Sequence, residues 1–265
     1  MQLLKINFHL SAQYITMKKL LLSFIACAFF LTGCFEITDE ITLKENGSGV
    51  LTSTNDMSML ISMLKGMGGA DAAGDDRPTD TTVSLLKVVD SISTLTPEEK
   101  ELAKKGKLDI IMNLTDEKMI TRLEIPFSKT EQIEKIKSLS SKISNYFIGK
   151  NIGEGMPPGM GDKMPSSDPI NDYFITTYSK GIIEKKLNKE KYAGLENDEA
   201  MTGIKEMSDN GMPVSSTIII NLPRPAKSVT GKGATLSEDK RKVTIKNSSE
   251  DFFDDASSLE FKIEY

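Results

Sequence analysis

Two hydrophobic periods alternate along the chain: a period of two, typical of strands, and a period of three to four, typical of helices. Residues 37–43 and 49–54 alternate on either side of ENGSG, a cluster of turn-forming residues, which predicts a β-hairpin. A helical face follows at Met57, Leu60, Ile61 and Leu64. The same order of hairpin and helix recurs within residues 107–147 and 172–210. Only the hydrophobic pattern recurs, and the residues themselves do not form a sequence repeat.

Capping residues indicate where the helices begin. Thr96-Pro97-Glu98-Glu99 combines a capping box with a proline at the first helical position, and Gly106 stops that helix. Ser128 and Glu131 form a second capping box, and Asn188 is placed to cap a third helix. The second helix has a continuous apolar face, formed by Ile133, Ile136, Leu139, Ile143 and Tyr146.

Further strands are predicted where alternation is bounded by turns or prolines. They cover residues 108–114 and 119–127, 173–178 and 182–187, 216–222 before Pro223 and Pro225, 227–236 and 241–246, and 259–265, whose buried face would carry Leu259, Phe261, Ile263 and Tyr265. Because strands joined by tight turns are antiparallel, we expect an α+β fold. Its hairpin–helix units would build an antiparallel sheet with helices packed on one face. Stretches rich in Gly and Pro near 67–79 and 149–170 predict mobile loops.

The N-terminal segment has a separate pattern. Lys18 and Lys19 precede an apolar run over residues 20–31, which is too short to cross a hydrocarbon core as a helix. A basic start followed by such a run and small residues is typical of a secretory signal peptide. Met17 is the better start for this signal, because it gives a short basic region directly.

The run ends in Leu31-Thr32-Gly33-Cys34, which resembles the lipobox of bacterial lipoproteins. The resemblance implies that the Cys34 thiol is joined to diacylglycerol, that the signal is cut before it, and that acyl chains such as palmitate are added to the new N-terminus. We therefore expect a signal peptide over 1–33 and an envelope domain over 34–265. An ordinary signal peptide or a buried helix that contains a cysteine is the alternative. In enterobacterial lipoproteins an Asp after the Cys retains the protein at the inner membrane, so Phe35 favours the outer membrane.

Composition narrows the chemistry of the expected mature domain. Residues 1–33 contain three lysines, the single histidine and Cys27 but no acid, so 30 Lys and Arg remain against 38 Asp and Glu, a net charge of −8. Without histidine or a second cysteine, this domain holds no Ser-His-Asp triad, no Cys-His pair, no His-ligated zinc and no internal disulfide. An acidic chain with four arginines is also a poor nucleic-acid binder, so we expect no nucleic-acid partner.

Three weaker patterns were weighed as binding sites. Thioethers bind Cu(I), and methionines cluster at 57, 59, 63 and 67 and at 156, 160 and 164, but methionine is also an adaptable apolar filler. Two acidic groups contain enough carboxylates to be considered as Ca²⁺ ligands, but neither has the spacing of an EF-hand: Asp71/Asp75/Asp76 and Glu250/Asp251/Asp254/Asp255. Gly231-Lys232-Gly233 lacks the rest of a phosphate loop. We therefore predict no metal site, no cofactor and no catalytic residue.

A second resemblance covers most of the expected mature chain. Asn46-Gly47-Ser48-Gly49, Leu222-Pro223 and Val243-Thr244-Ile245, together with the lipobox, resemble the LppM-type lipoprotein domain and related envelope lipoproteins of Bacteroidetes-type bacteria. The sequence departs from that family pattern because no C-terminal membrane helix is present. No catalytic residue is implied by the resemblance.

These observations favour a lipid-anchored cell-envelope lipoprotein that acts as a binding or accessory protein and not as an enzyme. The lipid anchor would attach it to the membrane, with the folded domain in the periplasm or at the cell surface. Its partner would be an envelope protein, a lipid or a glycan. The alternatives are a hydrolase of envelope glycans or esters that uses only carboxylates, and a structural subunit of an envelope complex.

Overall fold

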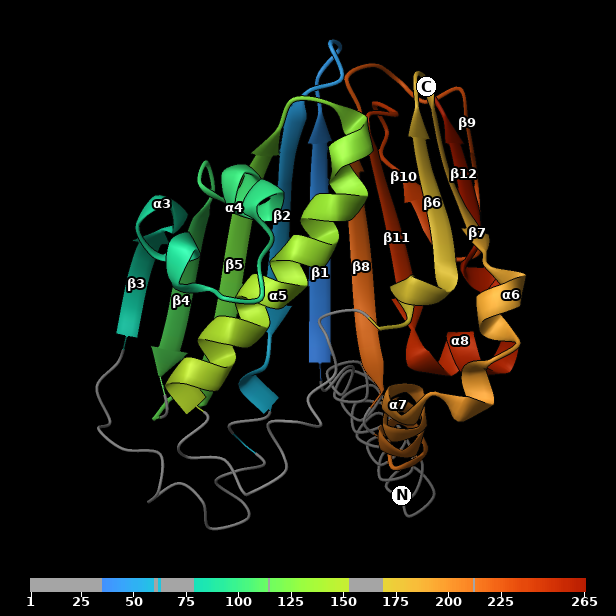
Figure 1. Cartoon of the computed structure of the whole chain (residues 1–265). Coiled ribbons are helices and arrows are strands. Elements are labelled where there is room, and N and C mark those ends of the chain that lie inside the picture. The colour runs from blue at the N-terminus through green and yellow to red at the C-terminus, as the bar shows by residue number, and fades with distance from the viewer. Residues whose placement is uncertain (1–34, 60–61, 63–78, 114, 153–168, 212) are drawn as a thin grey trace, which may run out of the picture. The chain divides into compact units, whose positions relative to one another are not determined.

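Eight strands form the main sheet of the protein (Figure 1), in the order β10-β11-β8-β1-β2-β5-β4-β3. Residues 35–59, 62, 79–113, 115–152, 169–211 and 213–265 are described in this computed structural model, and Cys34–Tyr265 forms one compact unit. The strands are β1 (Phe35–Leu43), β2 (Gly49–Asp56), β3 (Thr79–Ser84), β4 (Lys107–Asn113), β5 (Lys118–Phe127), β8 (Val214–Asn221), β10 (Ala234–Leu236) and β11 (Lys242–Ser248). Neighbouring strands are antiparallel except for β1 and β8, which are parallel.

A second, four-stranded antiparallel sheet has the order β6-β7-β12-β9. It consists of β6 (Phe174–Ser179), β7 (Ile182–Leu187), β9 (Ser228–Thr230) and β12 (Phe261–Glu264). Ile183 of β7 and Ile263 of β12 belong to the same hydrophobic cluster as the inner face of the main sheet. The second sheet therefore packs on that face, beside the long helix α5 (Ile133–Ile152).

The remaining helices are short. They are α3 (Leu85–Val88), α4 (Pro97–Ala103), α6 (Lys189–Tyr192), α7 (Glu199–Asp209) and α8 (Ser249–Asp255), with 3₁₀ turns at Val89–Ser91, Thr130–Gln132, Asn171–Tyr173, Leu195–Asn197 and Ala256–Leu259. No helix of the described ranges is long and apolar enough to cross a membrane.

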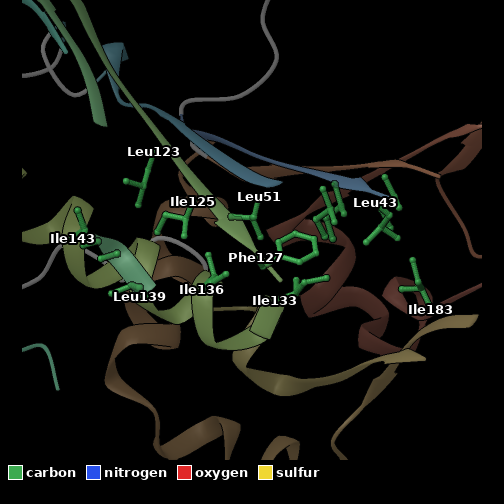
Figure 2. Close-up of a cluster of buried hydrophobic side chains, with 14 of the residues drawn as sticks. Leu43, Leu51, Leu123, Ile125, Phe127, Ile133, Ile136, Leu139, Ile143 and Ile183 are labelled. Carbon is green, nitrogen blue, oxygen red and sulfur yellow. The ribbon is translucent and has the colours of Figure 1, made fainter. Parts of the chain in front are cut away.

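The main hydrophobic core lies between the inner face of the main sheet and α5 (Figure 2). The predicted apolar stripe of α5 provides four side chains that are completely buried, Ile133, Ile136, Leu139 and Ile143. Alternate residues of β2 and β5 meet this stripe, among them Leu51, Leu123, Ile125 and Phe127. The apolar face of the helix, which repeats every 3.6 residues, thus packs against the apolar faces of the strands, which repeat every two residues.

A smaller core surrounds Phe252 of α8, which is completely buried. The Phe252 ring lies 5.6 Å from the ring of Tyr173, 5.8 Å from that of Tyr192 and 6.2 Å from that of Phe174. These tilted and edge-on contacts join α8 to the start of β6 and to α6.

Two ends of the unit are useful landmarks. The N-end is where β1 and β8 begin and where β2 and β11 end. The C-end carries the β1–β2 turn, the β6–β7 turn and the C-terminal Tyr265, which line one cleft together. In Figure 1 the C-terminus lies at the top, and α7 and α8 lie near the bottom.

The predicted α+β class, with antiparallel pairing dominant and helices packed against a sheet, is confirmed. The three predicted hairpins form as β1–β2, β4–β5 and β6–β7. The Thr96–Glu99 capping box opens α4, and the Asn188 side chain accepts a hydrogen bond from the Lys191 N–H at the start of α6. The third hairpin, however, belongs to the second sheet, which the strand pattern did not separate from the first.

Two local predictions are wrong. Gln132, and not Glu131, caps the segment before α5, because its Oε1 accepts from the backbone N–H groups of Ser128 and Lys129. Residues 227–236, predicted as one strand, form two. A turn at 231–233 separates β9, which pairs with β12, from β10, which pairs with β11. Gly231 and Gly233 permit this turn, with φ values of 139° and 78°. Most of the predicted helical face after Met57, and most of the predicted loops near 67–79 and 149–170, lie outside the described residues.

Candidate functional site

The inner face of the main sheet becomes polar toward the N-end. Five inward-facing polar side chains are less than 9% exposed: Asp39, Ser53, Asn55, Thr121 and Asn247. Cross-strand register groups them, because Asp39 lies opposite Ser53 and Asn55 lies opposite Thr121. Buried polar side chains are costly unless they are paired, so this group needs an explanation beyond packing.

Asp39 is the centre of this polar group. One of its carboxylate oxygens accepts a hydrogen bond of 2.7 Å from the Ser53 hydroxyl. The other lies 3.7 Å from the Lys137 Nζ of α5, and both side chains of this ion pair are about 10% exposed or less. A strand of the main sheet is thereby joined to α5 through charge at the polar end of the interior.

The second sheet joins the same network through Tyr178 of β6. Its hydroxyl is hydrogen-bonded to the Glu134 carboxylate of α5, and burial, the largest cause, together with this carboxylate raises the pKa of Tyr178 far above its usual range. The Glu134 carboxylate lies 4.0 Å from the Lys137 Nζ. The Lys137 Nζ therefore lies within 4.0 Å of two carboxylates, one on β1 and one on α5.

A cavity of about 260 Å³ opens beside Asp39 and Lys137. It is lined by Ile37 and by ten polar residues, which are Asp39, Ser53, Glu134, Lys137, Ser138, Ser141, Lys142, Asn145, Asn171 and Asp172. Carboxylate and amide oxygens can accept hydrogen bonds there, and ammonium, hydroxyl and amide groups can donate them. We call this space the polar cavity.

Unpaired polar atoms occur on the inner face of the main sheet, and one of them, on Asn55, adjoins the polar cavity. Asn55 Oδ1, Thr121 Oγ1 and Asn247 Oδ1 are buried and have no hydrogen-bond partner. Asn55 adjoins the cavity wall, because its Nδ2 contacts the Ser144 hydroxyl of α5, one residue before Asn145. Each unpaired buried group costs about 1–3 kcal/mol, and a polar molecule in this part of the interior would reduce that cost.

The rim of the polar cavity is tied to α4. The Lys142 Nζ donates a hydrogen bond of 2.7 Å to the Glu99 carboxylate, whose other oxygen accepts from the Thr96 N–H in the capping box. The Lys142 hydrogen bond, followed by that of Thr96, holds the pKa of Glu99 below its usual value of 4.5. Glu99 thus fixes Lys142 at the rim.

Two further clefts are open to solvent. A cleft of about 570 Å³ separates α7 from α8. Most of its charged lining residues are acidic, among them Asp209, Glu250 and Asp254. A cleft of about 490 Å³ lies at the C-end, where Lys44, Lys180 and Arg224 are balanced by Glu45, Glu131 and the C-terminus. The mixed charge of this C-end cleft favours no one class of ligand.

The structure describes only some of the residues that the sequence analysis considered as lipidation or metal-binding sites. Cys34, the methionines from 63 onward, and Asp71, Asp75 and Asp76 lie outside the described residues. Met57 is buried and Met59 is 39% exposed. Within the described ranges no group of three or more His, Cys, Asp or Glu residues could hold a metal ion.

The second acidic group and the glycine–lysine fragment have local roles. Ser248 caps α8, because its hydroxyl accepts a hydrogen bond from the Asp251 N–H and donates one to the Asp251 carboxylate, which lies 3.1 Å from the Lys232 Nζ. Hydrogen bonds from Ser248 and the charge of Lys232 lower the pKa of Asp251 against an opposing effect of burial, which is the largest single cause. Lys232 therefore serves a surface ion pair.

The polar cavity was not predicted from the sequence. The available signal was polar residues at inward positions of strands, such as Asp39 between Ile37 and Ile41, and a lysine on the inner side of α5. Such interruptions in an apolar pattern indicate a buried polar site only when the facing residues are known.

Comparison with models of protein families and with curated proteins found no match. Among solved structures, the NMR structure of the folded domain of Mycobacterium tuberculosis LppM is similar, with 10% sequence identity and a TM-score of 0.38. The similarity covers 88% of this chain and 91% of that one. The structure therefore has a weak LppM-like resemblance.

We expect Lys137→Met to destabilise the domain by about 3–5 kcal/mol, because Asp39 would be left as a buried charge without its cation. The free energy of unfolding in urea measures this loss. The matched control is Lys135→Met on the same helix, whose partner Glu98 is largely exposed, and which should cost about 1 kcal/mol or less. The double variant Asp39→Asn/Lys137→Met should recover part of the loss, and equal effects of the two single lysine variants would contradict the buried pair.

The lowered pKa of Glu99 predicts a pH dependence of stability. Its contribution is complete above the usual value near 4.5 and is lost as the pH falls through the lower pKa of the folded state. Glu99→Gln should therefore reduce the loss of unfolding free energy between about pH 5 and pH 3. Glu98→Gln, on the exposed side of α4, is the control, and an identical pH slope in wild type and Glu99→Gln would refute the role assigned to Glu99.

Proposed function

We propose that the protein is a lipid-anchored lipoprotein of the cell envelope and that its folded domain binds a small polar molecule or polar group of an envelope partner. The lipobox before residue 35 supports the anchor. The observation that carries the binding role is the polar cavity, because ten of its eleven lining residues are polar and the buried Asp39–Lys137 pair lies in its wall.

The chemistry of the polar cavity favours binding over catalysis. Asp39 already accepts from Ser53 and pairs with Lys137, and Lys142 is engaged by Glu99. Charged groups held in this way orient a ligand, since moving them during a reaction would break buried pairs. The partner would be an envelope protein, lipid or glycan, and we place the anchor in the outer membrane because Phe35 follows Cys34.

The anchor predicts that Cys34→Ala abolishes acylation. Cells are grown with a labelled palmitate precursor, and the label on the immunoprecipitated protein is measured together with its membrane fraction. The thiol of Cys34 is the acceptor in the proposed chemistry, so the variant should lose the label and remain unprocessed or become soluble. Cys27→Ala is the matched control and should keep the label. Label retained by Cys34→Ala would show that the anchor is misassigned.

The binding role predicts a ligand that copurifies with the full chain. Native mass spectrometry of the protein extracted in mild detergent should show a mass above that of the acylated chain. Ser141→Trp would fill the polar cavity and should remove the added mass, whereas Thr202→Trp, in the cleft between α7 and α8, should retain it. If the added mass is absent, or is equally present in Ser141→Trp, the polar cavity is not a ligand site.

A further inference from the structure

We propose that the lipid bilayer is the direct partner of the N-end of the domain, so that the protein stands on the membrane with β1 and β8 pointing away from it. This inference rests on the proposed lipid attachment at Cys34. It adds an orientation that attachment alone does not specify, since most flexible linkers would leave the domain free to turn.

The first step is the length of chain between anchor and fold. Cys34 is covalently bound to Phe35, and Phe35 is the first residue of β1, where it pairs with Val214 of β8. One residue spans at most about 3.6 Å. The acylated residue would therefore lie within one residue of the main sheet.

The second step is that β1 cannot serve as a linker. It is an interior strand, paired with β8 on one side and with β2 on the other, and Glu36 already lies opposite Asp56. Releasing its first residues would break ladder hydrogen bonds on both sides. The anchor would thus be tied to the centre of the sheet and not to a free edge.

The third step is the height of the domain. The nine residues of β1 span about 30 Å at roughly 3.3 Å each, so the C-end lies about that far from the anchor. α7 ends at Asp209, shortly before β8 begins at Val214, and α8 follows directly on β11. The open cleft between α7 and α8 would therefore lie on the membrane side (Figure 1).

Charge alone would not produce this arrangement. Exposed side chains near the N-end include Glu36, Asp209, Glu250 and Asp254 together with Lys118 and Lys205, so this mixed surface has no excess of cations to attract anionic headgroups. The tether, and not surface electrostatics, would hold this end against the lipid. The protein without its acyl chains should then show no affinity for vesicles.

The test uses the cysteine content of the chain. The mature protein would contain only Cys34, whose thiol is blocked by lipid, so one introduced cysteine can be labelled with a fluorophore without interference. Lys118→Cys and Asn210→Cys place the label near the N-end, and Glu45→Cys and Glu238→Cys place it at turns of the C-end; all four side chains are exposed. The acylated full chains are reconstituted into phosphatidylcholine vesicles that contain a nitroxide-labelled lipid.

We expect quenching at the two N-end positions to be at least about twofold stronger than at the two C-end positions, given their separation of about 30 Å. Inserting eight Gly and Ser residues between Cys34 and Phe35 should remove the difference, because such a linker reaches about 16 Å on average. Equal quenching at both ends, or stronger quenching at the C-end, overturns the orientation. An intact mass without acyl chains would instead show that the proposed anchor itself is wrong, and the orientation with it.

Discussion

The parallel pairing of β1 with β8 is the constraint on which the rest of the fold depends. It joins residues 35–43 to residues 214–221 in the middle of the main sheet, so every other element is inserted between the two partners or follows them. Parallel neighbours require a long crossover, and here the crossover contains β2 to β7 and α3 to α7. Closing such a long loop is entropically costly, and the buried core that α5 and the second sheet complete must offset that cost.

The same core has two different halves. Toward the C-end the inner face is apolar, with Ile41, Ile220 and Val243 completely buried. Toward the N-end it is polar and is organised around Asp39, where β1, α5 and β6 meet through Lys137, Glu134 and Tyr178. A hydrophobic replacement of such a network is often neutral or stabilising, so this network joins the three elements without adding much net stability.

Helices, caps and hairpins could be predicted from the sequence, whereas the division into two sheets and the polar cavity could not. The stripe of α5, the Thr96 cap and the β4–β5 hairpin depend on neighbours within a few residues, so their patterns are visible in one segment. The division into two sheets depends on β9 and β12, which are short and pair across about thirty residues. The polar cavity was missed because Asp39 and Lys137 are almost one hundred residues apart, and neither is unusual by itself.

The position of Asp39 links the two proposals physically. It is five residues after Cys34 and four after the first residue of β1, so the polar cavity would lie within about 17 Å of the acyl-bearing residue at roughly 3.3 Å per residue. That distance is about half of the roughly 30 Å that β1 spans, so the cavity would lie near the middle of the domain's height. A ligand held between Asp39 and Lys137 would cross-link β1 to α5, and so it would stabilise the strand to which the proposed anchor would be joined.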